Sequence, residues 1–333
     1  MTIADDSRTV VRRAVRDALG DLDPGDLVLV ACSGGADSLA LATATADVCA
    51  GLRLRAGAVI VDHGLQEESD RVAAQALERC REFGLDPVVV IRVDVASFTT
   101  GAGLEAAARD ARHAALAECA RESSAKAVLL GHTIDDQAET VLIRLTRGSG
   151  ARSLSAMAPR SGLLRRPLLG VSRAVLRSTI SPDIVWEDPH NGDDDFLRVR
   201  VRRDVLPVMT RALGDSVVLG LARTAESLRA DADALDEWTD SAWSRCVPDG
   251  EFPDRDVVVA VDALTSLPTA IRTRVLRRAA VSAGAPAGSL TRAHVVAMDE
   301  FLSHWHGQGP LSLPGGVTVT RKGGRINVSR PTG

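Results

Sequence analysis

Cysteine is scarce and scattered in this chain of 333 residues. The five cysteines stand at positions 32, 49, 80, 119 and 246, and no two of them form a CxxC pair. This spacing argues against a zinc ribbon and against thioredoxin-type redox chemistry. An odd number of dispersed cysteines fits reduced thiols, and we therefore expect a cytoplasmic protein.

Long apolar runs are also missing. No run approaches the roughly 18 residues that suggest a membrane span. The N-terminus is charged from Asp5 onwards and lacks the apolar region of a signal peptide. We therefore expect a protein that does not engage a membrane.

Lysine is nearly absent, since only Lys126 and Lys322 among the 40 basic residues are lysines. The net charge of −4 does not by itself indicate a nucleic-acid partner, but the charge is unevenly distributed. From Arg144 to Ile180 there are eight arginines and no acidic residue. A solvated basic face is the ordinary explanation of such a run. We favour the alternative, a surface that binds phosphate.

The stretch Leu27–Leu41, LVLVACSGGADSLAL, predicts a buried strand, a tight loop and a helix that starts at Asp37 or Ser38. Adjacent glycines allow backbone N–H groups to approach a ligand, and a helix N-terminus attracts anions. The loop has no lysine and lacks Walker A spacing. An aspartate at the helix start suggests that the anion arrives with a metal ion. The plainer alternative is a glycine-rich turn without a ligand.

Further apolar runs at 57–61, 88–93 and 127–130 alternate with helical patterns. This alternation predicts an α/β fold with a doubly wound parallel sheet. Four polar residues directly follow predicted strands: Ser33, Asp62, His63 and His132. Ligands bind beyond the carboxyl ends of such strands, so we expect these residues to meet in one crevice.

The character of the chain changes after about residue 212. We predict a first domain over 1–212 and a second, mainly helical domain over 213–333 that ends in a small β element at 311–328. In the first domain, Gly148–Gly162 is predicted to be loop, Ser172 to cap a short helix, and Ile184–Trp186 to form a short strand.

A cluster of acids follows the strand at 127–130. Asp135 or Asp136 could cap the next helix, and Asp136 and Glu139 share a face of it. Capping and solvation alone would explain an isolated cluster of this kind. Because Mg²⁺ on a phosphate needs one or two carboxylates, Asp37 and Asp136 form the simplest pair to hold it.

The alanine-rich helix over 104–121 places Glu105, Arg109 and Arg112 on one face. A surface salt bridge between Glu105 and Arg109 is the simple explanation. The functional alternative is an arginine that stabilises charge developing on phosphate or base.

These motifs together resemble a known family. SGGADS at 33–38 resembles the pyrophosphate loop of N-type ATP pyrophosphatases, the PP-loop superfamily. GHTIDDQAET at 131–140, followed by RLTRGSGARSLSAMAP at 144–159, resembles the tRNA(Ile)-lysidine synthase family more specifically. The other similar segments, in the family's order, are VDHGL at 61–65, LEAAARDARH at 104–113, RRPLL at 165–169, EDPHNGDDDFLRVRVR at 187–202 and, more weakly, LPGG at 313–316.

The resemblance implies a ligase that uses ATP and Mg²⁺. In that family, ATP adenylates the 2-carbonyl oxygen of the wobble cytidine in the isoleucine tRNA with a CAU anticodon, and pyrophosphate leaves. The side-chain amine of free L-lysine then attacks the 2-carbon, and AMP departs. The product, lysidine, switches codon reading from AUG to AUA. A homodimer is one assembly that we consider.

The resemblance also implies the site residues. Those that would hold ATP are Ser33, Gly34, Gly35, Ala36, Asp37, Ser38, Asp62, His63, Gly131 and His132. Those implied in catalysis are Asp37, Arg109, Arg112 and Asp136, with Asp37 and Asp136 on Mg²⁺. Asp135 and Glu139 would hold the substrate lysine, and the tRNA backbone would meet Arg147, Arg198, Arg200 and Arg202.

The chain departs from the family's pattern at four positions. Gln66 stands where arginine is usual, Val199 where asparagine is usual, and His113 and Phe196 where tyrosine is frequent. Val199 puts one polar contact near the active site in doubt. We also expect a short form, without the further C-terminal module of longer relatives.

Three other protein classes fit the sequence less well. A tRNA thiolase should carry a cysteine pair near the site, and Cys119 has no near neighbour in sequence. GMP or NAD synthetase would need different substrate segments. A non-catalytic nucleotide-binding module would not need Asp37 and Asp136.

Overall fold

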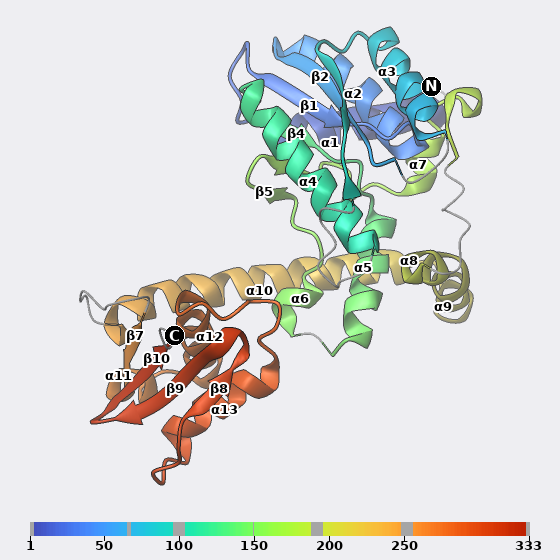
Figure 1. The fold of residues 1–333 in the computed structure, drawn as a ribbon. Coiled ribbons are helices and arrows are strands. Elements are labelled where there is room, and N and C mark those ends of the chain that lie inside the picture. The colour runs from blue at the N-terminus through green and yellow to red at the C-terminus, as the bar shows by residue number, and fades with distance from the viewer. Residues whose placement is uncertain are drawn as a thin grey trace. The chain divides into compact units, whose positions relative to one another are not determined.

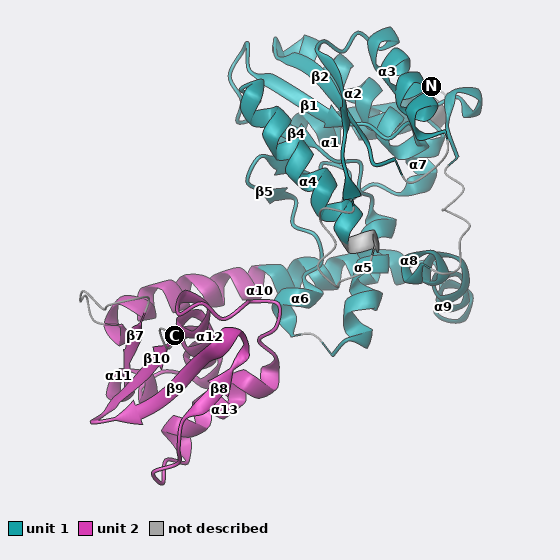
Figure 2. Ribbon diagram, viewed as in Figure 1, with its two compact units in different colours: residues 1–229 teal, residues 230–333 magenta. Residues whose placement is uncertain are grey.

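The computed structural model describes residues 3–64, 68–95, 104–148, 150–187, 196–247 and 256–330. The chain forms two compact units, residues 1–229 and 230–333 (Figure 2). The division falls within the long helix α10 (Val217–Cys246). The boundary expected near residue 212 lies at the end of the preceding helix, α9 (Leu206–Leu213), and stays a prediction.

Unit 1 is built on a six-stranded sheet in the order β3-β2-β1-β4-β6-β5 (Figure 1). Its four main strands are parallel: β1 (Leu27–Ala31), β2 (Arg55–Asp62), β3 (Val88–Arg92) and β4 (Ala127–Leu129). β6 (Leu164–Arg165) is parallel to β4, and β5 (Arg160–Ser161) pairs antiparallel with β6. The predicted α/β fold with a parallel sheet is confirmed.

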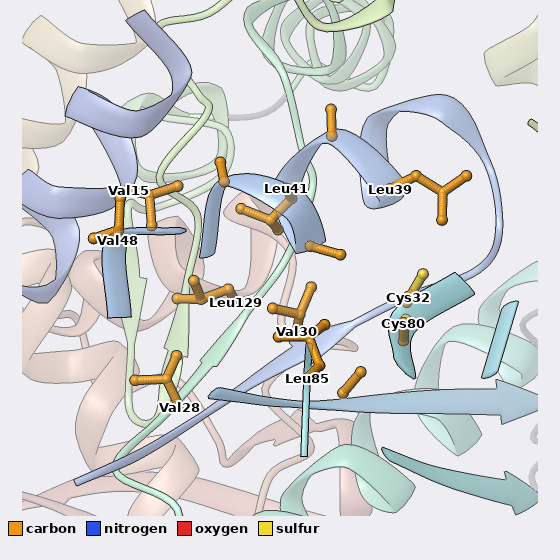
Figure 3. Packing of buried hydrophobic residues seen from close by; sticks show 14 of the residues in the cluster. Val15, Val28, Val30, Cys32, Leu39, Leu41, Val48, Cys80, Leu85 and Leu129 are labelled. Carbon is orange, nitrogen blue, oxygen red and sulfur yellow. The ribbon is translucent and has the colours of Figure 1, made fainter. Parts of the chain in front are cut away.

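The central strand β1 is buried on both faces, as its unbroken apolar run predicts. Val28 and Val30 pack in the cluster that contains residues of α1 (Ile3–Leu19) and α2 (Ala36–Leu52), as Figure 3 shows. Leu27 and Leu29 point to the opposite face, where residues of α4 (Leu104–Glu122) cover them. Alternate β1 side chains therefore fill two separate cores, one on each face of the sheet.

The strand order places a switch point between β1 and β4. β2 and β3 lie on one side of β1, whereas β4, β6 and β5 extend the sheet on the other side. In sheets of this kind, the loops that follow the two central strands diverge and leave a crevice at their carboxyl ends. Ser33–Gly35 follows β1 and Gly131–Thr133 follows β4, so both loops border this crevice.

The remaining elements of unit 1 include two departures from the sequence prediction. The segment predicted as loop holds α6 (Ala151–Leu154) and β5, and β6 follows it. The strand predicted at 184–186 is wrong, because Pro182–Ile184 is a 3₁₀ turn and Trp186 donates its N–H to the Gly34 carbonyl instead of pairing in a sheet. The predicted cap Ser172 is confirmed at the start of α7 (Arg173–Arg177). The other helices here are α3 (Ser69–Glu82), α5 (Ile134–Thr146), α8 (Leu197–Arg200) and a π-helical turn at Val201–Val205.

Unit 2 combines helices with a small antiparallel sheet in the order β7-β10-β9-β8. The helices are the later part of α10, α11 (Val261–Thr265), α12 (Thr269–Ser282) and α13 (Arg292–Ser303). The strands are β7 (Val257–Ala260), β8 (Leu311–Leu313), β9 (Val317–Lys322) and β10 (Arg325–Ser329). The expected helical second part with a terminal β element is confirmed. The sheet also contains β7, which lies before the predicted β element in sequence and pairs with β10.

No single described helix has the length and apolarity to cross a membrane. Leu197–Leu213 and Val217–Cys246 pass such a test only as a pair, across a bend of 101°.

Candidate active site

The glycine loop after β1 is closed by a serine hydroxyl. Gly34 has a φ of +83°, which favours glycine. Ser38 Oγ donates to the Gly35 carbonyl at 2.9 Å and accepts the Ser33 N–H at 3.2 Å. α2 begins at Ala36, slightly before the predicted start at Asp37 or Ser38, and its N-cap Gly35 supplies no side-chain cap. The first N–H groups of α2 therefore remain available to an anion.

The loop opens on a cleft of about 870 Å³ at the carboxyl ends of the strands. Most predicted site residues line it: Ser33, Gly35, Ala36, Asp37, Ser38, Asp62, His63, Arg112, Gly131, His132, Asp135, Asp136 and Arg202. Gly34 lines a smaller neighbouring cleft. The predicted residues that do not line the main cleft are Arg109, Glu139, Arg147, Arg198 and Arg200.

The end of β4 lies directly against the start of α2. A Cβ atom at Gly131 would stand 3.3 Å from the carbonyl carbon and oxygen of Asp37. Such a contact is tight, so glycine permits this approach of the two backbones. The glycine loop and the acidic helix α5 consequently share one end of the cleft.

One guanidinium links the acids of the two segments. Arg173, the first residue of α7, donates Nε–H to Asp37 Oδ2 at 3.4 Å and Nη2–H to Asp136 Oδ1 at 3.1 Å. Its backbone N–H donates to Asp135 Oδ2 at 2.8 Å. Sequence reasoning missed Arg173, because its position in the arginine-rich segment does not distinguish it from its neighbours.

Glu139 lies beneath this contact and is fully buried. Arg202 donates Nε–H to it at 2.7 Å, Arg198 Nε–H at 2.8 Å, and Arg173 Nη2–H at 3.4 Å. Arg198 and Arg202, expected on the tRNA backbone, thus bind an internal carboxylate. By contrast, Arg147 and Arg200 are exposed.

The helix α5 is capped by Thr133, not by Asp135 or Asp136 as predicted. Thr133 Oγ1 accepts the Asp136 N–H at 3.3 Å, and Asp136 Oδ2 accepts the Thr133 N–H at 2.7 Å. This capping box fixes Asp136 with its other oxygen toward the arginines. Both Asp136 oxygens are therefore engaged in hydrogen bonds.

The two cleft aspartates differ in their proton affinity. Burial raises the pKa of Asp37, although Arg173 partly opposes this shift. Burial acts in the same sense on Asp136, but Arg198 and Arg173 outweigh it and lower the pKa of Asp136. Asp136 is therefore the more firmly ionised of the two.

A basic wall faces these acids. Arg112 and His113 of α4 line the cleft, and neither has a hydrogen-bond partner among the described residues. Desolvation and the positive neighbours Arg109 and Arg198 lower the pKa of Arg112. Desolvation, aided by Arg166 and Arg198, lowers the pKa of His132 to about 3. His132 is thus neutral at physiological pH, and its Nδ1 is buried without a described partner.

Asp37 has an oxygen suited to Mg²⁺. Asp37 Oδ1 is buried and accepts no hydrogen bond from the described residues. A hard cation prefers such an oxygen. The described part of the chain contains no cluster of three or more His, Cys, Asp or Glu side chains suited to a metal, so phosphate oxygens would have to complete the coordination.

Some sequence expectations concern side chains outside the described set, namely Gln66 and Glu105. Val199 is buried, and His113 lines the cleft.

A cysteine pair near the loop was also missed by the sequence prediction, because Cys32 and Cys80 are distant in sequence yet belong to one buried cluster. Only the α3–sheet packing brings these two residues together.

Comparison with known proteins identifies the family. A family model described as "PP-loop domain" matches residues 7–209, and one described as "TilS substrate binding domain" matches residues 260–326. A tRNA(Ile)-lysidine synthase of Thermobifida fusca is 53% identical over 96% of this chain and 97% of its own length. The chain belongs to the tRNA(Ile)-lysidine synthase family.

Further relatives agree with this membership. The tRNA(Ile)-lysidine synthases of Streptomyces coelicolor and Salinispora tropica are 50% and 48% identical, over 92% and 96% of this chain and 86% and 96% of theirs. The predicted enzyme class, a ligase with an ATP-utilising PP-loop domain, is confirmed. The structure of the U34-tRNA thiolase NcsA from Methanococcus maripaludis, with its [4Fe-4S] cluster, is similar with a TM-score of 0.56 at 17% identity. It covers 68% of this chain and 79% of its own, and this likeness concerns the fold alone.

Proposed function

We propose that this chain joins the side-chain amine of free L-lysine to the 2-carbon of the wobble cytidine in the CAU-anticodon isoleucine tRNA. ATP first adenylates the cytidine 2-carbonyl oxygen, which releases pyrophosphate. The lysine amine then displaces AMP to form lysidine and to switch reading from AUG to AUA. The single observation that carries the proposal is the contact of Asp37 and Asp136 with one guanidinium beside the glycine loop.

We propose that the glycine loop binds the triphosphate of ATP. The uncapped N–H groups at the start of α2 and the Ser33 hydroxyl can donate to phosphate oxygens, while the Ser38 hydroxyl holds the loop through the Gly35 carbonyl. Asp62, the last residue of β2, and His63, which follows it, line the cleft, and we assign the adenosine to this part of it. The cleft volume falls within the range of small-molecule sites.

Asp37 is the residue that would hold Mg²⁺, since its Oδ1 is the uncommitted oxygen. Asp136 would join it only after Arg173 gave up its contact. When bound, Mg²⁺ supplies positive charge that stabilises the departing pyrophosphate. Arg112 lines the cleft without a described hydrogen-bond partner, and we assign it to a phosphate or to the cytidine.

The substrate lysine would be held by carboxylates. Asp135 lines the cleft and uses one oxygen on the Arg173 N–H, which leaves the other for an ammonium group. Glu139 does not line the cleft, so we assign it a positioning role through Arg173. Of the two acids expected to contact lysine, only Asp135 keeps that role in the proposal.

The tRNA would be bound by exposed arginines and by the second domain. Arg147 and Arg200 are exposed and free to meet phosphates. The substrate-binding family match at 260–326 supports an accessory tRNA-binding role for the domain over 213–333. A cytoplasmic location and assembly into a homodimer remain predictions.

The test is mass analysis of nucleosides from isoleucine tRNA incubated with the protein, ATP and lysine. We expect the wobble cytidine to become lysidine only when all three substrates are present. A methionine tRNA with the same anticodon is the matched control and should remain unmodified. An unchanged isoleucine tRNA, or a sulfur-containing nucleoside in place of lysidine, would contradict the proposal.

A further inference from the structure

Two cysteines meet directly beneath the glycine loop. Cys32 follows β1 and precedes Ser33, while Cys80 is on α3. They are 3% and 0% exposed and pack in one cluster, side by side in Figure 3. Their contact joins the base of the loop to a helix on the face of the sheet.

The two thiols are chemically unequal. The neighbouring Cys80 thiol, against the effect of burial, lowers the pKa of Cys32 to about 7. The same contact raises the pKa of Cys80. Burial raises the pKa of the other three cysteines, with that of Cys49 reaching about 11. Cys32 is therefore the thiol that is most readily ionised near neutral pH.

Cys32 also borders the active site. It is one of the residues that line the main cleft, although its side chain packs in the buried cluster. The same sulfur lies 3.7 Å from Ser38 Oγ, the hydroxyl that closes the glycine loop. A covalent change at Cys32 would therefore alter the contact with Ser38 and the glycine loop proposed to hold phosphate.

We propose that Cys32 and Cys80 form an oxidation site at which a peroxide converts the two thiols into a disulfide and thereby weakens ATP binding. The loss of binding rests on the proposed function of the loop. The Cys32 thiolate attacks an oxygen of hydrogen peroxide, forms a sulfenic acid and releases hydroxide. The Cys80 sulfur then attacks the Cys32 sulfur, the S–O bond breaks, and the oxygen leaves as water. Two thiols lose two electrons, and the peroxide becomes two water molecules.

The disulfide changes the loop through Ser38. A covalent bond brings the Cys32 sulfur to about 2 Å from that of Cys80 and so changes its contact with the Ser38 hydroxyl, now 3.7 Å away. It also ties β1 to α3 beside the loop. ATP in the cleft covers Cys32, so bound ATP should slow the oxidation.

The experiment treats the full-length protein with hydrogen peroxide, blocks the remaining thiols and maps the cysteine peptides by mass spectrometry. ATP binding is measured before oxidation, after it, and after reduction with dithiothreitol. We expect a Cys32–Cys80 disulfide, at least a tenfold loss of ATP affinity and full recovery on reduction. Saturating ATP should slow disulfide formation at least tenfold.

Two variants at Cys80, Cys80→Ser and Cys80→Ala, should bind ATP as the reduced protein does and form no disulfide. Cys49→Ser, which changes another buried cysteine, is the matched control and should remain sensitive to peroxide. The proposal is overturned if Cys32 and Cys80 remain unlinked after oxidation, or if the linked protein binds ATP normally. A failure of the proposed function would appear separately, as a fully reduced protein that binds no ATP, and peptide mapping would then still decide the oxidation site.

Discussion

Arg173 donates its Nε–H to Asp37 across 3.4 Å, and this contact connects the start of α2 with the first residue of α7. The same guanidinium reaches Asp136 on α5. Three helices that are separated in sequence therefore place charged groups at one end of one cleft. Desolvation lowers the pKa of Arg173, but Asp136, Glu139 and Asp37 outweigh it and raise that pKa overall.

Arg173→Ala should destabilise the protein and depress ATP cleavage. It leaves buried carboxylates without their shared cation, a change that costs about 3–5 kcal/mol in buried ion pairs. Denaturant unfolding measures the loss. Arg177→Ala is the control, because its exposed ion pair with Glu187 should change the free energy of unfolding by less than about 1 kcal/mol. Equal stability of the two variants would show that the Arg173 contact is unimportant.

Asp135→Asn and Glu139→Gln should separate lysine binding from architecture. Asp135 lines the cleft, so its amide variant should raise the KM for lysine about tenfold or more while the KM for ATP changes little. Glu139 is buried among three arginines, so its amide variant should lower the free energy of unfolding by about 3–5 kcal/mol. Steady-state kinetics and thermal unfolding check both. An unchanged lysine KM in Asp135→Asn would remove that residue from the lysine site.

The arginines should fall into two groups when tRNA binding is measured against salt concentration. Arg147 and Arg200 are exposed, so each alanine variant should reduce the slope of log K against log salt by about 1. Arg198 binds Glu139, so Arg198→Ala should lower the free energy of unfolding rather than change the salt slope. A slope that stays unchanged in both exposed variants would place the tRNA surface elsewhere.

The apolar runs explain how much of the fold could be predicted. Buried strands at Leu27–Ala31 and Ala127–Leu129 are evident from composition, and parallel-sheet geometry then gathers the residues that follow them. β5 and β6 have two residues each, too few for a detectable alternation. They are defined only by tertiary pairing, because β6 pairs with β4 and β5 pairs with β6.

The polar contacts of the site were harder to predict. The resemblance indicates Asp37 and Asp136, but the cation between them depends on how α7 packs beside α5, which no local pattern encodes. Arg198 and Arg202 belong to a basic motif that suggests a surface, yet Arg198 on α8 and Arg202 on the π-helical turn that follows both bind Glu139. Tertiary packing, rather than residue type, decides whether an arginine binds an internal acid or an external phosphate.

His132 should make the protein sensitive to mild acid. Its pKa is about 3 in the folded chain, against about 6.5 in an unfolded one. Between these two pKa values, His132 is protonated in the unfolded state but not in the folded state. The free energy of unfolding therefore falls as the pH drops below about 6.5. From pH 7 to pH 5 the loss from this group is on the order of 2 kcal/mol.

The variant His132→Gln lacks this titration and should lose correspondingly less stability over the same range, as urea unfolding at each pH can measure. Identical pH profiles for the two proteins would mean that His132 titrates normally.

The central claim is that the glycine loop and the acidic helix form one ATP-cleaving site. Pyrophosphate release, measured with ATP and isoleucine tRNA and then with lysine added, tests it most directly. The account predicts tRNA-dependent release in the unaltered protein, loss of release by at least a hundredfold in Asp37→Ala, and normal release in Asp47→Ala, which alters an exposed acid of the same helix. A folded Asp37→Ala protein that releases pyrophosphate at the original rate would contradict it.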